Sequence, residues 1–72
     1  MNKNNKIKII VNGKLLTVNL KFSIKNLIEK LKTPVNKVAI ELNEEIVDKK
    51  KLNKIFLKNK DKFEIVHFIG GG

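Results

Sequence analysis

Three glycines, Gly70-Gly71-Gly72, end the sequence, and they are the residues with the clearest chemical potential. Glycine has no Cβ and tolerates most backbone conformations, so a run of glycines forms a thin arm. Such an arm suits a terminal carboxylate that has to enter a narrow site on another protein. Taken alone, the run is a weak signal, because chain ends and linkers are often rich in glycine. Its interpretation depends on the elements that precede it.

Other kinds of site chemistry have few candidate residues. His67 is the only histidine and the sequence has no cysteine, so a metal centre or a nucleophile would lack its usual partners. We expect His67 to be an ordinary strand residue. Asp61 and Glu64 are interpreted as a turn residue and a surface charge rather than an acid–base pair. The sequence therefore predicts no catalytic residue and no metal site.

The net charge of +9 raises the question of nucleic-acid binding, because clustered cations displace the counterions of phosphate backbones. All 16 basic residues are lysine, however, and arginine is better suited to bidentate contacts with phosphates and bases. Abundant lysine, asparagine and isoleucine are together typical of an AT-rich genome, and Lys49-Lys50-Lys51 is interpreted as a solvated surface. We expect no nucleic-acid partner.

The length and the hydropathy pattern favour one small soluble domain. The N-terminal MNKNNK lacks the apolar stretch of a secretory signal, and no segment approaches the roughly 18 apolar residues that span a bilayer. We expect no membrane association and a cytoplasmic location, or the plastid stroma if the gene is organellar. Residues 1–72 are expected to form a single domain with a flexible tail at residues 70–72.

The N-terminal part of the sequence predicts a β-hairpin. Ile7, Ile9 and Val11 alternate with Lys6, Lys8 and Ile10, which is a strand pattern, and Asn12-Gly13 can supply the two positive φ angles of a type I′ turn. A two-residue loop at this point pairs the inward apolar residues of the two strands with one another. The same register leaves Ile10 opposite Leu15 on the outer face.

After the hairpin, the hydrophobic period becomes helical. The apolar stripe consists of Ile24, Leu27, Ile28 and Leu31. Ser23 is a natural N-cap, but Asn26 replaces the usual Glu or Gln, so we expect only half of a capping box. Thr33-Pro34 is expected to end the helix.

The rest of the sequence predicts three further strands, at residues 38–42, 45–47 and 63–68. Asn43-Glu44 is the expected turn between the first two. Residues 52–57 predict an irregular or one-turn helical segment that places Leu52, Ile55 and Phe56 under the sheet. This order of elements predicts an α+β fold of the ubiquitin-like β-grasp type, a mixed sheet with one main helix on one face.

Taken together, these elements resemble the ThiS family, the sulfur carriers of thiamine (thiazole) biosynthesis. The resemblance rests on the helix SIKNLIEKL, the strand-turn-strand VAIELNEEIV and the closing DKFEIVHFIGGG, and it covers almost the whole chain. Members of that family usually carry Gly-Asp where this sequence has Lys60-Asp61. We therefore expect a different turn conformation there.

The resemblance implies that Gly72, with Gly71 beside it and Gly70 in the flexible tail, carries sulfur. An adenylating enzyme related to the ubiquitin-activating enzymes would use ATP and magnesium to activate the Gly72 carboxylate. Sulfur would then displace the adenylate and leave a covalent thiocarboxylate, which thiazole synthase would use. The chain would bind no cofactor of its own and would be a protein-bound reagent rather than an enzyme.

A carrier also has to dock on its partners, so an exposed apolar patch is expected on the sheet face away from the helix. If Phe63 and Ile65 face the core, strand alternation turns Val66 and Phe68 outward. These two residues are expected to join Ile10 and Leu15 in a docking patch, which gives four candidate residues: Phe68, Val66, Ile10 and Leu15.

Three alternative functions stay open. The small subunit of molybdopterin synthase shares the fold and the Gly-Gly end but serves a different acceptor, and its members tend to be longer than this chain. A ubiquitin-like modifier would form isopeptides between Gly72 and lysines. An RNA-binding β-grasp module would account for the positive charge but not for Gly70-Gly71-Gly72.

Overall fold

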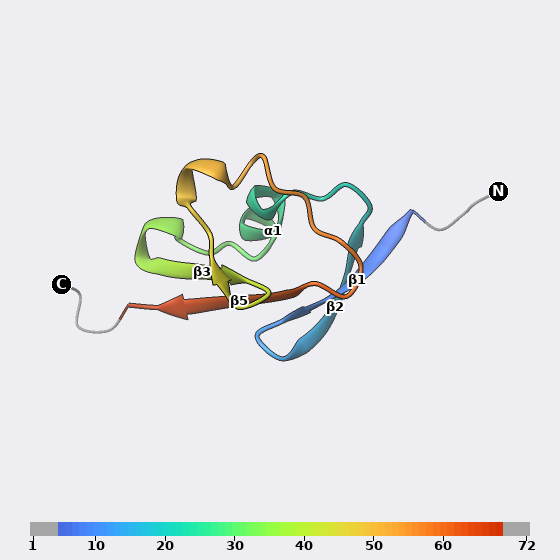
Figure 1. Cartoon of the computed structure of the whole chain (residues 1–72), viewed down its shortest axis with the longest axis horizontal. Helices are drawn as coiled ribbons and strands as arrows, with labels where there is room; N and C mark the ends of the chain where they lie inside the picture. Colours follow the sequence, from blue (N-terminus) through green and yellow to red (C-terminus); the bar gives the residue numbers. More distant parts are fainter. Residues whose placement is uncertain (1–4, 69–72) are drawn as a thin grey trace.

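The computed structural model describes residues 5–68 as a five-stranded mixed sheet with one helix on one face (Figure 1). The elements are β1 (Lys6–Val11), β2 (Lys14–Asn19), α1 (Ile24–Lys30), β3 (Val38–Leu42), β4 (Glu45–Ile46) and β5 (Lys62–His67), with short 3₁₀ turns η1 (Val35–Lys37) and η2 (Lys49–Lys51). The strand order is β2-β1-β5-β3-β4, in which β1 and β5 are parallel and the other pairs antiparallel. The predicted α+β β-grasp fold is confirmed.

The β1–β2 hairpin has the predicted register, with Ile10 opposite Leu15. Asn12 and Gly13 have φ angles of 48° and 82°, as a type I′ turn requires. Asn12 also contacts β5: its side-chain oxygen accepts from the Ile65 N–H at 2.7 Å, and its side-chain nitrogen donates to the Ile65 carbonyl at 3.2 Å. The turn is therefore tied to the central strand, which the sequence did not indicate.

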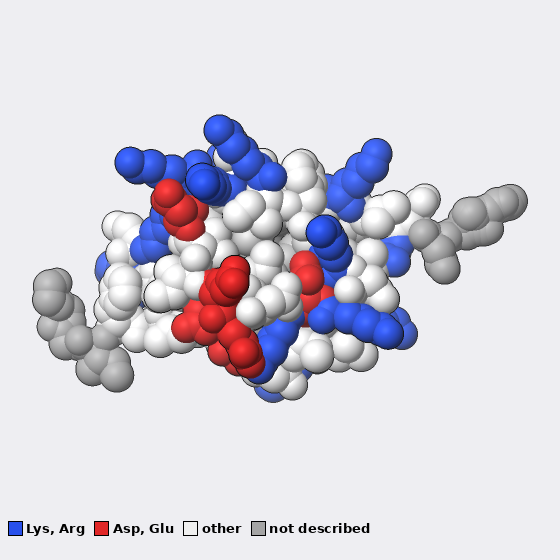
Figure 2. All heavy atoms as spheres, in the orientation of Figure 1, with Lys and Arg blue, Asp and Glu red and all other residues white. Residues whose placement is uncertain are grey.

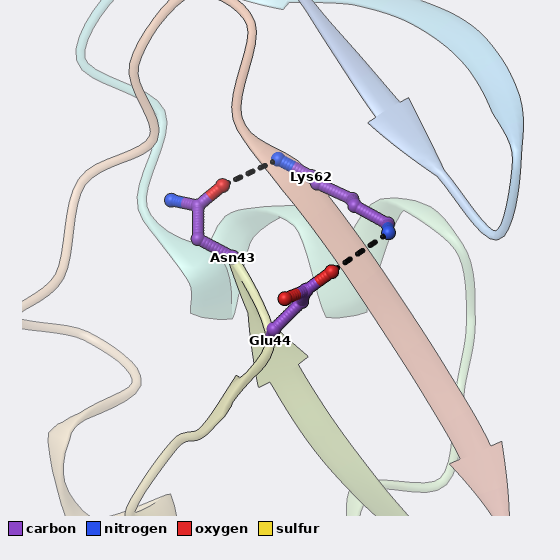
Figure 3. A network of polar contacts seen from close by, with 3 residues as sticks. All are labelled: Asn43, Glu44 and Lys62. Carbon is purple, nitrogen blue, oxygen red and sulfur yellow. Dashed lines mark hydrogen bonds and ion pairs between the residues drawn. The ribbon is translucent and has the colours of Figure 1, made fainter.

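The β3–β4 hairpin contacts β5 in a similar way from the opposite side (Figure 3). Asn43 and Glu44 have φ angles of 52° and 71°, so this turn is also of the type I′ class. The Asn43 side-chain oxygen accepts from the Lys62 N–H at 3.0 Å, and the Glu44 carboxylate lies 3.3 Å from the Lys62 ammonium. That ion pair is exposed and contributes little to the free energy of unfolding, so the hydrogen bond from the Lys62 backbone to Asn43 is the stronger restraint on the turn.

The helix α1 begins and ends differently from the prediction. The Ser23 hydroxyl accepts from the Asn26 N–H and the Asn26 side-chain oxygen accepts from the Ser23 N–H, each at 3.0 Å, so the capping box is complete. The expectation of half a box was wrong, because the carboxamide oxygen of asparagine is an acceptor as well. At the other end, the Thr33 N–H donates to the Ile28 carbonyl at 3.1 Å while Lys32 has a φ of 55°. This is a Schellman-type end, so Pro34 follows a helix that has already closed.

The core lies between α1 and the sheet, and the segment from β4 to β5 runs over the same side as α1 (Figure 1). Phe63, at the start of β5, is fully buried within it. Leu52 is buried and Ile55 half-buried, as predicted, but Phe56 is 52% exposed and Leu57 is buried instead. Phe56 pairs with Ser23 in an isolated bridge, so this stretch is extended and alternation turns Phe56 outward. Among residues 5–68, no helix is long and apolar enough to cross a bilayer.

Lys60 keeps a glycine-type backbone despite its side chain. Its φ is 74°, in the left-handed region that glycine favours, and its N–H donates to the Lys8 carbonyl at 2.7 Å. The expectation of a turn different from that of the family's Gly-Asp stays a prediction.

Replacing Lys60 with glycine is expected to stabilise the protein. A side chain in the left-handed region costs about 1–2 kcal/mol. The extra freedom of glycine in the unfolded chain offsets part of this gain, so the free energy of unfolding should rise by about 0.5–1 kcal/mol. Urea unfolding measures the change. Lys58→Gly is the control, because Lys58 has no positive φ, and it should lower stability; equal destabilisation by both substitutions would contradict the strain argument.

Candidate functional site

The sheet face away from α1 holds Ile10, Leu15 and Val66 of the predicted docking patch, and Phe68 follows the last residue of β5. Ile10, Leu15, Val66 and Phe68 are 37%, 67%, 48% and 58% exposed. Ile10 lies beside Lys62 in the parallel β1–β5 pair, and Val66 has the same parity as Lys62 on β5, so these side chains point to one face. The predicted outward orientation is therefore found for Ile10, Leu15 and Val66.

The four residues nevertheless form two separate pairs. Ile10 and Leu15 lie level with Lys62, whereas Val66 is four residues further along β5, about 13 Å away at about 3.3 Å per residue. Glu64 lies between them on the same face. The continuous patch expected from the sequence was wrong, because β1 ends beside the first half of β5 and the second half extends past it.

The pair Val66 and Phe68 lies at the end of the central strand, and only Ile69 separates Phe68 from the glycine tail in the sequence. Val66 pairs with Ala39 of β3, and the Phe68 N–H donates to the Lys37 carbonyl at 3.2 Å. The Lys49 ammonium lies 5.3 Å from the centre of the Phe68 ring, within the range of a cation–π contact. The chain is thus held by hydrogen bonds and a side-chain contact up to Phe68. Gly70, Gly71 and Gly72 lie outside the described residues.

Acidic side chains gather beside this pair, although the chain is strongly basic. Figure 2 shows them clustered over the β3–β4 hairpin and the neighbouring part of β5, with lysines around the rest of this view. Glu41 lies opposite both Glu64 and Ile46 in the sheet, and Ile46 is 76% exposed. This grouping could not be predicted from the sequence, because it depends on which strands are neighbours in the sheet.

The residues with acid–base potential have structural roles. Asp61 accepts from the Lys58 N–H at 2.7 Å and from the Asn43 side-chain nitrogen at 3.0 Å, so it is a turn residue as predicted. His67 is exposed on β5 opposite Val38. Within residues 5–68, no three His, Asp or Glu side chains are grouped so that they could hold a metal ion. Next to the glycine tail, the described residues offer two exposed apolar side chains, Val66 and Phe68.

Comparison with known proteins identifies the family. The model of the ThiS family matches residues 4–72. The chain belongs to the ThiS family. A solved ThiS-family structure, the crystal structure of the thiamine biosynthesis protein ThiS from Geobacter metallireducens, is 30% identical and has a TM-score of 0.81. The match covers 92% of this chain and 100% of that one.

Two curated proteins resemble this ThiS-family chain in sequence. The sulfur carrier protein ThiS of Bacillus subtilis (strain 168) is 46% identical over 35 residues, which is 49% of this chain and 53% of that protein. A thiazole synthase of Paramagnetospirillum magneticum (strain ATCC 700264 / AMB-1) is 36% identical over 66 residues, which is 92% of this chain. The chain spans 20% of the length of that thiazole synthase.

Proposed function

We propose that this chain is a sulfur carrier protein that supplies sulfur for thiazole formation in thiamine biosynthesis. The observation that carries the proposal is the family match, which extends from residue 4 to Gly72 and so includes the Gly-Gly end. The similarity to a protein named sulfur carrier protein ThiS supports the same role.

In the proposed reaction, the Gly72 carboxylate is activated by a separate adenylating enzyme of the ubiquitin-activating type. A carboxylate oxygen attacks the α-phosphate of ATP, with magnesium present, and pyrophosphate leaves. Hydrosulfide (HS⁻) released by a separate donor then attacks the acyl carbon, AMP leaves, the sulfur loses its proton, and a thiocarboxylate remains on Gly72. Gly71 and Gly70 have no Cβ that would collide with a narrow channel.

The described part of the chain supports this role, because the strand that precedes the tail is held in place by hydrogen bonds. β5 is the central strand, hydrogen-bonded to β1 and β3, and the side chains of Asn12 and Asn43 bind its backbone from either side. The tail therefore follows a strand whose first half is held from both sides and whose last two residues pair with β3. Thiazole synthase is the proposed acceptor, because a protein of that name contains a segment similar to this chain.

A reconstituted transfer assay tests the choice of acceptor. The chain is loaded with the activating enzyme, ATP, magnesium and a sulfur donor, and is then mixed with thiazole synthase or with the large subunit of molybdopterin synthase. We expect sulfur to leave the chain with thiazole synthase. Transfer to the molybdopterin subunit alone, or isopeptide bonds from Gly72 to lysines, would assign the chain to another carrier or modifier class.

Docking through Phe68 gives a second prediction. Phe68→Asp places a charge in the exposed apolar pair next to the tail, and it should weaken binding to the activating enzyme about 30-fold, the effect of losing a contact worth about 2 kcal/mol. Titration calorimetry measures the affinity. Phe56→Asp is the matched control, because Phe56 is 52% exposed and Phe68 58%. Unchanged affinity for Phe68→Asp, or an equal loss for Phe56→Asp, would rule out this docking site.

A further inference from the structure

A cavity of about 380 Å³ lies on the helix side of the molecule, between α1, the 3₁₀ turn η1 and the segment around residues 49–53. Its apolar lining comes from Ile28, Val35 and Leu52, of which Ile28 and Leu52 are buried. This volume falls within the range of small-molecule sites, which are mostly apolar with a few polar groups. The sheet separates the cavity from Val66 and from the pair Ile10 and Leu15, whereas Lys49 at its edge also contacts the Phe68 ring.

The walls of this cavity are fixed by backbone hydrogen bonds. The Ile24 and Lys25 N–H groups at the start of α1 donate to the carbonyls of Ile55 and Leu52 at 2.9 and 3.0 Å. At the far end of α1, the Thr33 N–H donates to the Ile28 carbonyl at 3.1 Å. The cavity is therefore part of the packed fold and exists before any ligand binds.

The charges around the cavity select the kind of occupant. Lys25, Lys32 and Lys49 line it, against one acidic residue, Glu29. Lysine ammonium groups on flexible side chains bind carboxylate or phosphate as point charges. The apolar lining favours a ligand with an apolar part, because burying that part removes its surface from water. A purely apolar ligand would contact only the apolar lining, and a small inorganic anion would contact only the lysines.

We propose that this cavity binds a small amphipathic anion, a molecule with an apolar or aromatic body and one carboxylate or phosphate group. The apolar body packs on Ile28, Val35 and Leu52, and the anionic group lies among the three lysines. None of the lining residues belongs to the glycine tail or to the four docking residues, although Lys49 also contacts the Phe68 ring. Removal of the glycine tail is therefore expected to leave anion binding intact.

The test is an NMR titration of the full chain with 2-naphthoate, its neutral analogue 2-naphthamide, and acetate. We expect 2-naphthoate to shift the amide signals of Lys25, Ile28, Thr33 and Leu52. The neutral 2-naphthamide should bind at least about tenfold more weakly, a difference of about 1.4 kcal/mol, and acetate should give no shifts at these positions. Equal binding of naphthoate and naphthamide, shifts elsewhere on the surface, or the same shifts with acetate would each overturn the proposal.

Matched charge variants keep the test specific. Lys25→Gln combined with Lys49→Gln should weaken 2-naphthoate binding about tenfold, because two of the three cations are removed. Lys14→Gln combined with Lys58→Gln changes the net charge equally, away from the cavity, and should leave binding unchanged. All four lysines are exposed, so the variants are expected to fold. Equal weakening by both pairs would show attraction to the overall positive charge, with no defined site.

Discussion

Adding one phenylalanine after Gly72 is expected to abolish sulfur loading. The extension moves the carboxylate by one residue and adds a bulky side chain to an arm that otherwise has no Cβ atoms. A displacement of the reacting group by even 1 Å can lower a rate about 100-fold, so a loss of at least that size is expected. The readout is the rate at which the activating enzyme releases pyrophosphate from ATP in the presence of the chain.

The control for this variant carries the same phenylalanine directly after Met1. That chain has the same composition and an unaltered C-terminal end, so it should be activated at the wild-type rate. If the variant extended at Gly72 were activated as fast as this control, the chain end would not be the group that reacts.

Phe63→Ala is expected to have the largest effect on folding. Phe63 is fully buried, lies on the central strand, and is paired with Val11 on one side and Leu42 on the other. Truncating such a phenylalanine costs about 3–5 kcal/mol. Small domains have about 0.05–0.15 kcal/mol of stability per residue, so this loss removes much or all of the stability of a 72-residue chain. Urea unfolding followed by circular dichroism measures the change.

Two further variants keep that prediction testable if Phe63→Ala does not fold. Phe63→Leu retains most of the apolar volume and should cost about 1–1.5 kcal/mol. Phe68→Ala removes an exposed ring and should change the free energy of unfolding by no more than about 0.5 kcal/mol. Similar losses for Phe63→Leu and Phe68→Ala would contradict the assignment of Phe63 to the core.

The parts of the fold that the sequence predicts well are those set by local spacing. The alternation of inward and outward side chains, together with the Asn12-Gly13 turn, sets the register of the first hairpin. The 3.6-residue period of apolar residues identifies α1. Contacts between distant segments are not encoded in that way. Asn12 is interpreted from sequence as a turn residue, yet its side chain binds Ile65, which is 53 positions away.

The error at Phe56 has a similar physical origin. Ile55, Phe56 and Leu57 are three consecutive apolar residues, so the sequence contains no period that tells which one faces outward. The bridge between Phe56 and Ser23 determines which of the three side chains faces outward. That pairing joins two segments that are 33 positions apart in the sequence.

The candidate docking site was predictable in orientation but not in layout. Strand alternation is enough to turn Val66 and Phe68 outward. The separation of this pair from Ile10 and Leu15 depends on how far β5 extends past β1, which no local pattern reveals. The contact of Lys49 with the Phe68 ring likewise depends on where η2 packs.

Intact mass spectrometry tests the central claim most directly. The chain is incubated with the activating enzyme, ATP, magnesium and a sulfur donor, and its mass is compared with that of the untreated chain. Our account predicts the mass increase for the replacement of one oxygen by sulfur, located in the peptide that ends at Gly72. An unchanged mass, or the same increase in a chain that lacks Gly71 and Gly72, would contradict it.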